Sequence, residues 1–261
     1  MGLVEVLGTD SISDIIGISM PVTKWSYQIT KASEVPGAIA KAFYIAKSGR
    51  PGPVLIDITK NAQFEMFDFN YKKCIGIRSY SPIPKIDKNK ILDAAKLINA
   101  AKKPLIVSGQ GVILGNAEKE FKSFVEKSGI PAAWTILGAS ALPTSHELNV
   151  GMVGMHGNYG PNILTNQCDL LIAIGMRFDD RVTGDTNSYA KQAKIIHLEI
   201  DPVEIDKNIK VDVPVLGDCK ESLAMLSKNI KTKSYKNWLK IFDDLIKKEF
   251  NKVIKNDLSP K

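Results

Sequence analysis

The chain has 261 residues, of which 44% are hydrophobic and 24% are charged, and its formal net charge is +7. This length suits one large domain or two smaller ones, the composition is that of a globular protein, and no apolar run is long enough to cross a bilayer. The lysines are spread along the chain without the aromatic interleaving of RNA-binding proteins, which disfavours a nucleic-acid partner.

Cysteines and histidines are few and widely spaced. Cys74, Cys168 and Cys219 are odd in number and form no paired motif, which indicates a reducing compartment such as the cytoplasm and disfavours a disulfide framework. The three histidines are equally scattered, so no metal centre held by protein ligands is expected.

Residues 1–62 form a first block with few predicted elements. Residues 3–7 are apolar and strand-like without a preceding cap, so the chain is expected to begin inside a domain. Ser33 is predicted to cap a helix that ends at Gly49, and residues 54–58 read as a buried strand. This block has too few elements to close a core by itself.

A regular alternation of helices and strands follows residues 63–84, which have no period and read as a linker. Asp87 is predicted to cap a helix, and a glycine-rich loop at residues 151–160 precedes a short helix from Pro161. The predicted strands are short apolar runs at residues 105–107, 130–134, 170–174, 195–199 and 213–216. Such alternation predicts an α/β fold with a doubly wound, Rossmann-like (DHS-like) parallel sheet.

Four charged residues directly follow the strand at residues 170–174, namely Arg177, Asp179, Asp180 and Arg181. Ligands of open α/β sheets lie beyond the carboxyl ends of the strands, where guanidinium groups suit phosphate or carboxylate. A self-neutralising surface turn is the alternative. Glycines and acids at the other predicted strand ends favour a dinucleotide site, although Gly109-Gln110-Gly111 lacks the third glycine of the usual fingerprint.

The last predicted element is an amphipathic helix from Ser234. Its apolar stripe consists of Trp238, Phe242, Leu245, Ile246, Phe250 and Val253. Such a stripe is expected to pack on a neighbouring domain or element rather than on a membrane. The chain is expected to continue into a further domain after this helix.

Four motifs together resemble the large, catalytic subunit of the acetolactate synthase (acetohydroxyacid synthase) family, whose members depend on thiamine diphosphate. They are Ser-Gly-Arg-Pro-Gly-Pro at 48–53, Gly-Met-His-Gly at 154–157, Arg-Phe-Asp-Asp-Arg-Val-Thr-Gly at 177–184 and Gly-Asp at 217–218. The similarity runs over nearly the whole chain but covers only the middle of the family protein.

The resemblance implies a division into domains. Residues 1–62 correspond to the end of the pyrimidine-binding domain, 63–84 to a linker and 85–230 to the central FAD-binding domain. Residues 231–261 lead toward a pyrophosphate-binding domain. The glutamate that activates thiamine diphosphate would precede Met1, and the domain for its diphosphate and Mg²⁺ would follow Lys261.

The resemblance also implies residue roles. Arg181 matches the arginine that holds the carboxylate of the second 2-oxo acid, and Lys24, Lys60, Met155 and Asp180 match the substrate channel. The positions that would line FAD are Arg50, Gly109, Gln110, Gly111, Thr135, Ile136, Val153, Gly154, Met155, His156, Gly175, Met176, Arg177, Phe178, Asp179, Glu199, Ile200, Asp218 and Cys219. Alternatively, the two lysines are plain surface residues and Asp180 is a salt-bridge partner of Arg181.

Two stretches depart from the family pattern. Residues 11–14 are shorter than the usual glutamine-containing stretch, and Thr59-Lys60-Asn61 replaces a frequent Pro-Lys-Asp.

The reaction that the resemblance implies condenses pyruvate with pyruvate or 2-oxobutanoate and releases CO2, the first common step of branched-chain amino-acid synthesis. FAD would be largely structural. A homo-oligomer with a small regulatory subunit is expected. The rival readings are another FAD-bearing carboligase or oxidase, such as glyoxylate carboligase, and a non-catalytic dinucleotide-binding module.

Overall fold

The computed structural model describes residues 14–253, and contacts divide the chain into two compact units, Met1–Ile83 and Pro84–Lys261. Residues 65–87 form no helix or strand. Each unit is described separately. Within the described residues, no helix is both long and apolar enough to cross a membrane.

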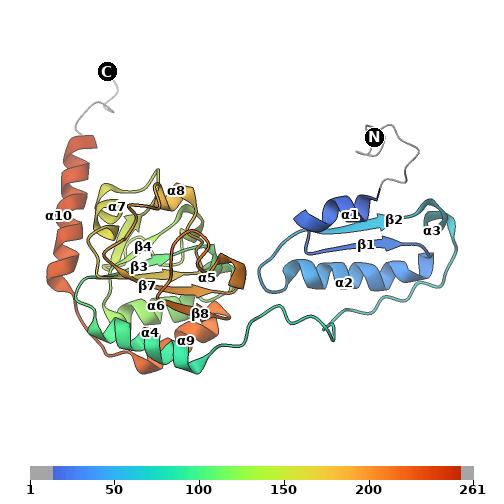
Figure 1. The fold of residues 1–261 in the computed structure, drawn as a ribbon, viewed down its shortest axis with the longest axis horizontal. Coiled ribbons are helices and arrows are strands. Elements are labelled where there is room, and N and C mark those ends of the chain that lie inside the picture. The colour runs from blue at the N-terminus through green and yellow to red at the C-terminus, as the bar shows by residue number, and fades with distance from the viewer. Residues whose placement is uncertain (1–13, 254–261) are drawn as a thin grey trace, which may run out of the picture. The chain divides into compact units, whose positions relative to one another are not determined.

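The first unit is a small parallel βαβ arrangement (Figure 1). Its elements are α1 (Ile15–Ser19), η2 (Met20–Val22), β1 (Trp25–Ile29), η3 (Ala32–Glu34), α2 (Val35–Lys47), β2 (Val54–Ile58) and α3 (Lys60–Phe64). Strands β1 and β2 pair in parallel from Trp25↔Val54 to Ile29↔Ile58, and α2 is the crossover between them. The hydrophobic cluster among the described residues of this unit is small: it consists of Ile29, Ala38 and Ala62, with Val35, Ile56 and Ile58 packed against it.

Two details of the first unit differ from the predictions. Ser33 does not cap α2, because it lies inside η3, which runs directly into the helix. Glu34 occupies the N-cap position, and its side chain makes no capping hydrogen bond to the helix. Strand β1 was not predicted at all. The predicted helix end is confirmed, since Gly49 follows the C-cap residue with a φ of +60°.

The second unit is a six-stranded, all-parallel sheet in the order β5-β4-β3-β6-β7-β8, which confirms the predicted fold class (Figure 1). Its strands are β3 (Pro104–Ser108), β4 (Ala132–Trp134), β5 (Asn149–Met152), β6 (Leu170–Ile174), β7 (Lys194–Glu199) and β8 (Val213–Leu216). Its helices are α4 (Lys88–Ala100), α5 (Gln110–Leu114), α6 (Glu118–Ser128), η4 (Ile136–Gly138), α7 (Tyr159–Thr165), α8 (Asp180–Thr183), η5 (Pro202–Glu204), α9 (Cys219–Asn229) and α10 (Lys236–Val253).

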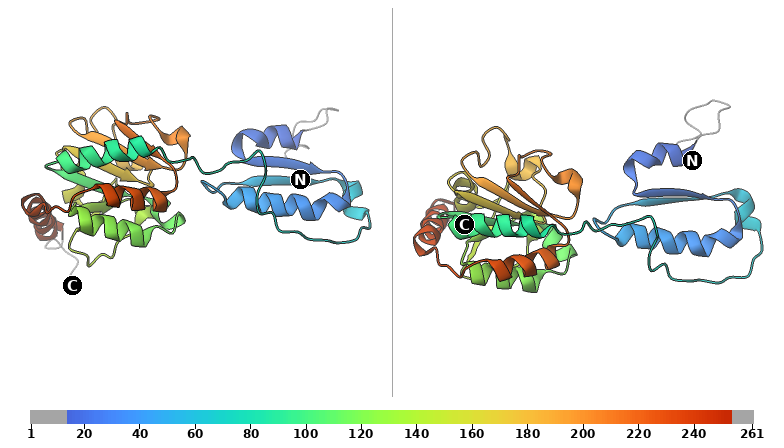
Figure 2. Two further views of the ribbon diagram at one scale, coloured as in Figure 1. Left: turned by 90° about the horizontal axis from the view of Figure 1, so that it is seen from below. Right: turned by 60° about the horizontal axis from the view of Figure 1, so that its bottom comes forward.

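Both faces of this sheet are covered, which explains the unbroken apolar runs of its central strands. Helices α4, α6 and α9 lie across one face (Figure 2), where they pack with Ile172 and Ile174 of β6. The alternate residues Leu171 and Ala173 face the second core cluster, which includes Trp238 of α10. Asp87 caps α4 by accepting a hydrogen bond from the Asn89 amide, as predicted.

Helix α10 belongs to this unit, where it packs on α7. Trp238 and Phe242 are buried and the Trp238 indole donates to the Pro104 carbonyl at 2.8 Å. Farther along the predicted stripe, Ile246 and Phe250 are exposed. The stripe is therefore used by this unit over its first turns.

The predicted glycine-rich loop at 151–160 is partly wrong. Its first two residues belong to β5, an edge strand that pairs with β4 through a register shift at Ala132/Ala133. Gly151 has a φ of +100° at this irregularity, as expected of a bulged edge. The helix predicted from Pro161 begins earlier, at Tyr159. Pro161 is tolerated in its first turn, because the amides there have no partner within the helix.

Candidate functional site

The carboxyl ends of the strands of the second unit meet at one edge of the sheet. The register pairs Ser108 of β3 with Ile174 of β6, Ile174 with Leu198 of β7, and Glu199 with Leu216 of β8. The turns after these strands therefore adjoin one another along the edge. This places Gly109, Gly175, Glu199 and Asp218 on the same edge, as the sequence predicted.

The glycines at this edge are explained by contact between two turns. The Gly111 amide donates to the Gly175 carbonyl at 2.8 Å, and a Cβ on Gly109 would lie 2.4 Å from that carbonyl oxygen. Gly175 itself has a φ of +57°, and its Cβ would lie 2.7 Å from the Gly111 Cα. Their lack of side chains is thus required by the packing of the β3 and β6 turns against each other. Gln110, between them, is exposed.

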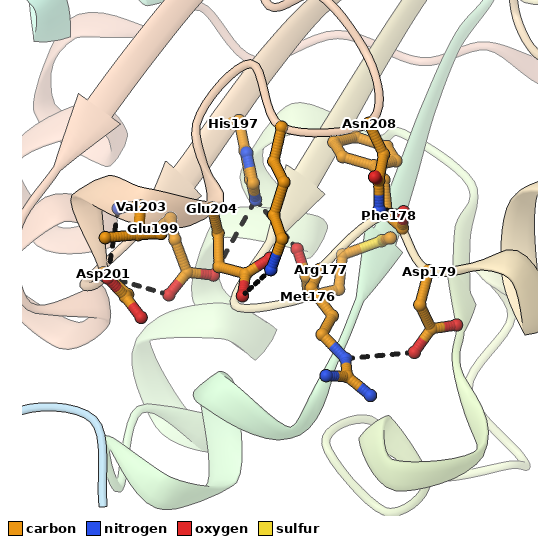
Figure 3. Close-up of polar contacts among 11 residues, drawn as sticks. Met176, Arg177, Phe178, Asp179, His197, Glu199, Asp201, Val203, Glu204 and Asn208 are labelled. Atoms are coloured by element: carbon orange, nitrogen blue, oxygen red, sulfur yellow. Dashed lines mark hydrogen bonds and ion pairs between the residues drawn. The ribbon is translucent and has the colours of Figure 1, made fainter. Parts of the chain in front are cut away.

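Residues 175–179, which we call the arginine turn, present one arginine between two buried side chains (Figure 3). Met176 and Phe178 are buried, and the Phe178 ring packs edge-to-face against His197 at 5.0 Å between centroids. Arg177 is exposed. The Arg177 side chain turns outward, whereas the side chains of Met176 and Phe178 belong to the core.

Asp179 joins the two arginines. Its Oδ2 accepts from Arg177 Nε at 3.0 Å, and its Oδ1 accepts from the Arg181 amide at 3.2 Å, which makes Asp179 the N-cap of α8. The Arg177 guanidinium is thereby oriented, and Arg181 is held in the first turn of α8. Asp180 lies between them and is exposed.

Residues 153–156, which we call the methionine loop, follow β5 and contact α8. The Met155 amide donates to the Arg181 carbonyl at 2.8 Å, and Arg181 Nη1 lies 3.6 Å from Met155 Sδ. Both side chains are exposed. Val153 is buried and His156 is exposed. The structure therefore sets a thioether beside a guanidinium, which suits a small ligand with an alkyl end and a carboxylate end.

A buried histidine supports the arginine turn, and the sequence patterns did not single it out as a site residue. His197 is fully buried, and its Nε2 lies 2.8 Å from the Met176 carbonyl oxygen. Burial lowers the pKa of His197, against the raising effects of this hydrogen bond and of Glu204 and Asp206. A neutral ring must donate from Nε2 because a carbonyl only accepts. The 3.7 Å contact with Glu199 is then not an ion pair.

Glu199 and the segment after β7 complete this part of the edge. Glu199 Oε1 accepts from the amides of Ile200 and Asp201 at 2.9 and 3.1 Å. Farther on, Asn208 Nδ2 donates to the Phe178 carbonyl at 2.6 Å. Together with His197, Asn208 fixes the carbonyls on both sides of Arg177 (Figure 3).

The remaining predicted positions of the second unit lie at the ends of β4 and β8. Thr135 is buried and its amide donates to the Ser108 carbonyl, whereas Ile136 is 67% exposed. Asp218 uses its carboxylate to cap α9 by accepting from the Glu221 amide at 3.1 Å. Burial, followed by the nearby carboxylates, raises the pKa of Cys219 to about 12, which favours the protonated thiol.

Lys24, Arg50 and Lys60 belong to the first unit. The Lys24 ammonium donates to the carbonyls of Ile45, Ser48 and Arg50 at 2.7, 2.6 and 3.0 Å, so it closes the C-terminal end of α2. This engagement favours a structural role for Lys24 over a channel role. Lys60 is exposed at the start of α3, and Arg50 is exposed in the turn before β2. Between residues 14 and 253, no three His, Cys, Asp or Glu side chains are grouped to hold a metal.

Comparison with known proteins identifies the family. Residues 91–226 match the model of the thiamine pyrophosphate enzyme, central domain. The chain is 46% identical over 228 residues to the acetolactate synthase large subunit of Corynebacterium glutamicum, covering 87% of this chain and 36% of that protein. It is 40% identical over 253 residues to the probable acetolactate synthase large subunit of Methanocaldococcus jannaschii, covering 93% and 42%.

The chain thus spans about two fifths or less of the length of these relatives, and the match confirms the resemblance drawn from the four motifs. The family model covers more than half of the chain and lies within the six-stranded unit. On this basis, the chain belongs to the thiamine pyrophosphate enzyme family and carries its central domain.

Proposed function

We propose that this chain is the central part of the large, catalytic subunit of an acetolactate synthase. The enzyme would condense two pyruvate molecules into 2-acetolactate with release of CO2, or pyruvate and 2-oxobutanoate into 2-aceto-2-hydroxybutanoate. The observation that carries the proposal is the pairing of Arg181 with Met155, with both side chains exposed at the ligand edge of the sheet. The similarity to acetolactate synthase large subunits supports it.

In this proposal, Arg181 binds the carboxylate of the acceptor 2-oxo acid and Met155 contacts its alkyl end. A guanidinium fixes the plane of a carboxylate as well as its charge, so the acceptor carbonyl is held in one orientation. The carbanion chemistry would be supplied by thiamine diphosphate with Mg²⁺ when these are bound, while the residues of this chain would hold and orient the acceptor. The central domain therefore contributes position, not bond-making groups.

We further propose that the same edge holds FAD. The edge combines the exposed Arg177 guanidinium with large exposed apolar side chains after β4, where Ile136 and Leu137 are 67% and 60% exposed. Such a set matches a ligand with flat rings and phosphates. The backbone of Met176 and Phe178 and the carboxylates of Glu199 and Asp218 stand at the same edge and are the polar groups that would contact it. A homo-oligomer and a small regulatory subunit complete the proposed assembly.

The test supplies the protein that contains this chain with pyruvate, thiamine diphosphate, Mg²⁺ and FAD. We expect stoichiometric CO2 and 2-acetolactate, measured by gas release and by colorimetric assay after decarboxylation to acetoin. Product from glyoxylate but none from pyruvate would favour a different carboligase. Bound flavin without any turnover would favour a binding module and contradict the proposal.

A further inference from the structure

One side chain on α7 clamps the methionine loop. Asn162 Oδ1 accepts from the Gly154 amide at 2.8 Å, and its Nδ2 donates to the Gly154 carbonyl at 2.9 Å. A carboxamide thus pairs with both backbone groups of a single residue. This pairing also fixes which end of the carboxamide is oxygen, because the amide needs an acceptor and the carbonyl a donor.

The clamped residue is the one that brings the loop against α8. Gly154 has a φ of +106°, a conformation that other residues rarely adopt, and a Cβ on it would lie 2.6 Å from the Arg181 carbonyl oxygen. This close approach lets the Met155 amide reach the same carbonyl at 2.8 Å. The position of Met155 relative to Arg181 therefore depends on the conformation of Gly154.

We propose that Asn162 is a positioning residue that, through Gly154, fixes Met155 against Arg181 and so sets the geometry in which the acceptor 2-oxo acid is captured. The inference rests on the proposed function. Arg181 and Met155 are exposed and have long side chains, and such side chains lose considerable rotamer freedom when they are held in one place. A loop held in advance lowers this cost at the moment of binding.

The loop keeps other anchors, so loss of the clamp loosens it without unfolding the sheet. The Val153 amide donates to the Trp134 carbonyl at 2.9 Å, and the Gly157 amide donates to the Gly154 carbonyl at 2.8 Å. Asn162 is half-buried behind the loop and acts only through it. Its removal is therefore expected to change the capture of the acceptor more than the amount of folded protein.

The experiment compares Asn162→Ala with Asn166→Ala in the enzyme that contains this chain. Asn166 is the matched control, because it caps the same helix and its Oδ1 accepts from the Ala190 amide at 2.7 Å, away from the methionine loop. The readout is the ratio of 2-acetolactate to released acetaldehyde at fixed pyruvate. A merely structural role would lower total turnover without moving this ratio.

We expect Asn162→Ala to lower the ratio about tenfold, the effect of losing one or two hydrogen bonds of ordinary strength, and Asn166→Ala to leave it unchanged. Asn162→Asp keeps the acceptor for the Gly154 amide and serves as the variant if alanine impairs folding; its ratio should also fall. Wild-type ratios in both Asn162 variants would overturn the inference while leaving the proposed function intact. A wild-type enzyme that forms no acetolactate would overturn the proposed function and this role together.

Discussion

The arginine turn and the methionine loop lie at the same edge of the sheet but are held in different ways. The arginine turn follows the central strand β6, where Gly175 is hydrogen-bonded to the strands or turns on both sides, from its amide to Leu198 and from its carbonyl to Gly111. The methionine loop follows β5, which lies at the edge of the six-stranded sheet beside β4. Packing between neighbouring turns therefore fixes the backbone conformation of the arginine turn. In the methionine loop, one side chain, that of Asn162, holds the backbone at Gly154.

This difference suits the two proposed ligands. A tightly bound, structural cofactor such as FAD benefits from a rigid support, and the carbonyls around Arg177 are held by His197 and Asn208. An acceptor that must enter and leave at every turnover suits a region whose local stability is lower. The comparison can be tested on glycines first, because each region contains one with a positive φ.

The largest expected effect is that of Gly175→Ala on stability. The new Cβ would meet backbone atoms of Gly111 and Val112 at 2.7–2.9 Å in a left-handed conformation. We expect the free energy of unfolding to fall by about 3 kcal/mol or more, because neither turn can move without disturbing a central strand. Hydrogen exchange of peptides from β3 and β6 in the intact chain measures it.

Gly154→Ala is the matched control in the methionine loop. Its Cβ would meet the Arg181 carbonyl oxygen at 2.6 Å, but an edge loop can shift away from that contact. Exchange should therefore increase in the loop and in α8, and not in β3 and β6. Equal increases in the central strands for both variants would contradict the proposed difference in support.

Much of this architecture could be predicted from the sequence, because central strands buried on both faces are unbroken apolar runs. Strands β6 and β8 have the predicted bounds. The edge strand β5 was missed because Gly151 is typical of a loop. Hydrogen bonds to the partner strand β4 outweighed the low strand propensity of this glycine. Strand β1 carried a signal that was not used, since Trp25, Tyr27 and Ile29 alternate with polar residues.

At the site, the sequence indicated which residues gather at the edge but not which way they point. Met176 and Phe178 are buried because apolar side chains of the arginine turn pack into the core below it. His197 could have been noticed, since it stands two residues before Glu199 on the same face of a strand. The Asn162 clamp joins a loop to a helix eight residues away, and no periodicity encodes that pairing.

The second largest effect is expected from Arg181→Lys. This variant tests whether Arg181, beside the methionine loop, captures the acceptor 2-oxo acid. Lysine keeps the charge but not the planar fork, so capture of the second 2-oxo acid should slow roughly ten- to a hundredfold. Flavin binding and CO2 release should change little. The ratio of acetolactate to acetaldehyde, together with flavin absorbance, gives both readouts. Loss of flavin at an unchanged product ratio would assign Arg181 to the cofactor instead.

A smaller effect is expected from Arg177→Met, which tests the arginine turn. Removal of one charged hydrogen-bond donor should weaken FAD binding about tenfold. Stability should stay nearly unchanged, since Arg177 is exposed and its pair with Asp179 lies at the surface. Flavin titration of the variant and of Arg181→Met as control measures the difference. Equal weakening in both variants would show that the two arginines do not have separate roles.

The smallest expected effect is the pH dependence that His197 confers on the same turn. Burial depresses its pKa in the folded protein below the ordinary value of about 6.5, so the unfolded chain binds the proton more readily. The contribution of the neutral ring is therefore fully present above that value and is lost as the pH falls toward the folded pKa, with a slope of at most about 1.4 kcal/mol per pH unit.

His197→Gln should remove this contribution to the slope while keeping a donor for the Met176 carbonyl, and His156→Gln, which alters an exposed ring, controls for the loss of a histidine. The measurement is urea unfolding of the intact chain between pH 5 and pH 8, followed by hydrogen exchange at the arginine turn. His197 contacts the arginine turn and not the methionine loop. Acidification should therefore loosen the peptide containing Arg177 before the one containing Met155. Simultaneous loosening of both peptides would mean that the turn and the loop share one support, which would contradict the different contacts that hold them.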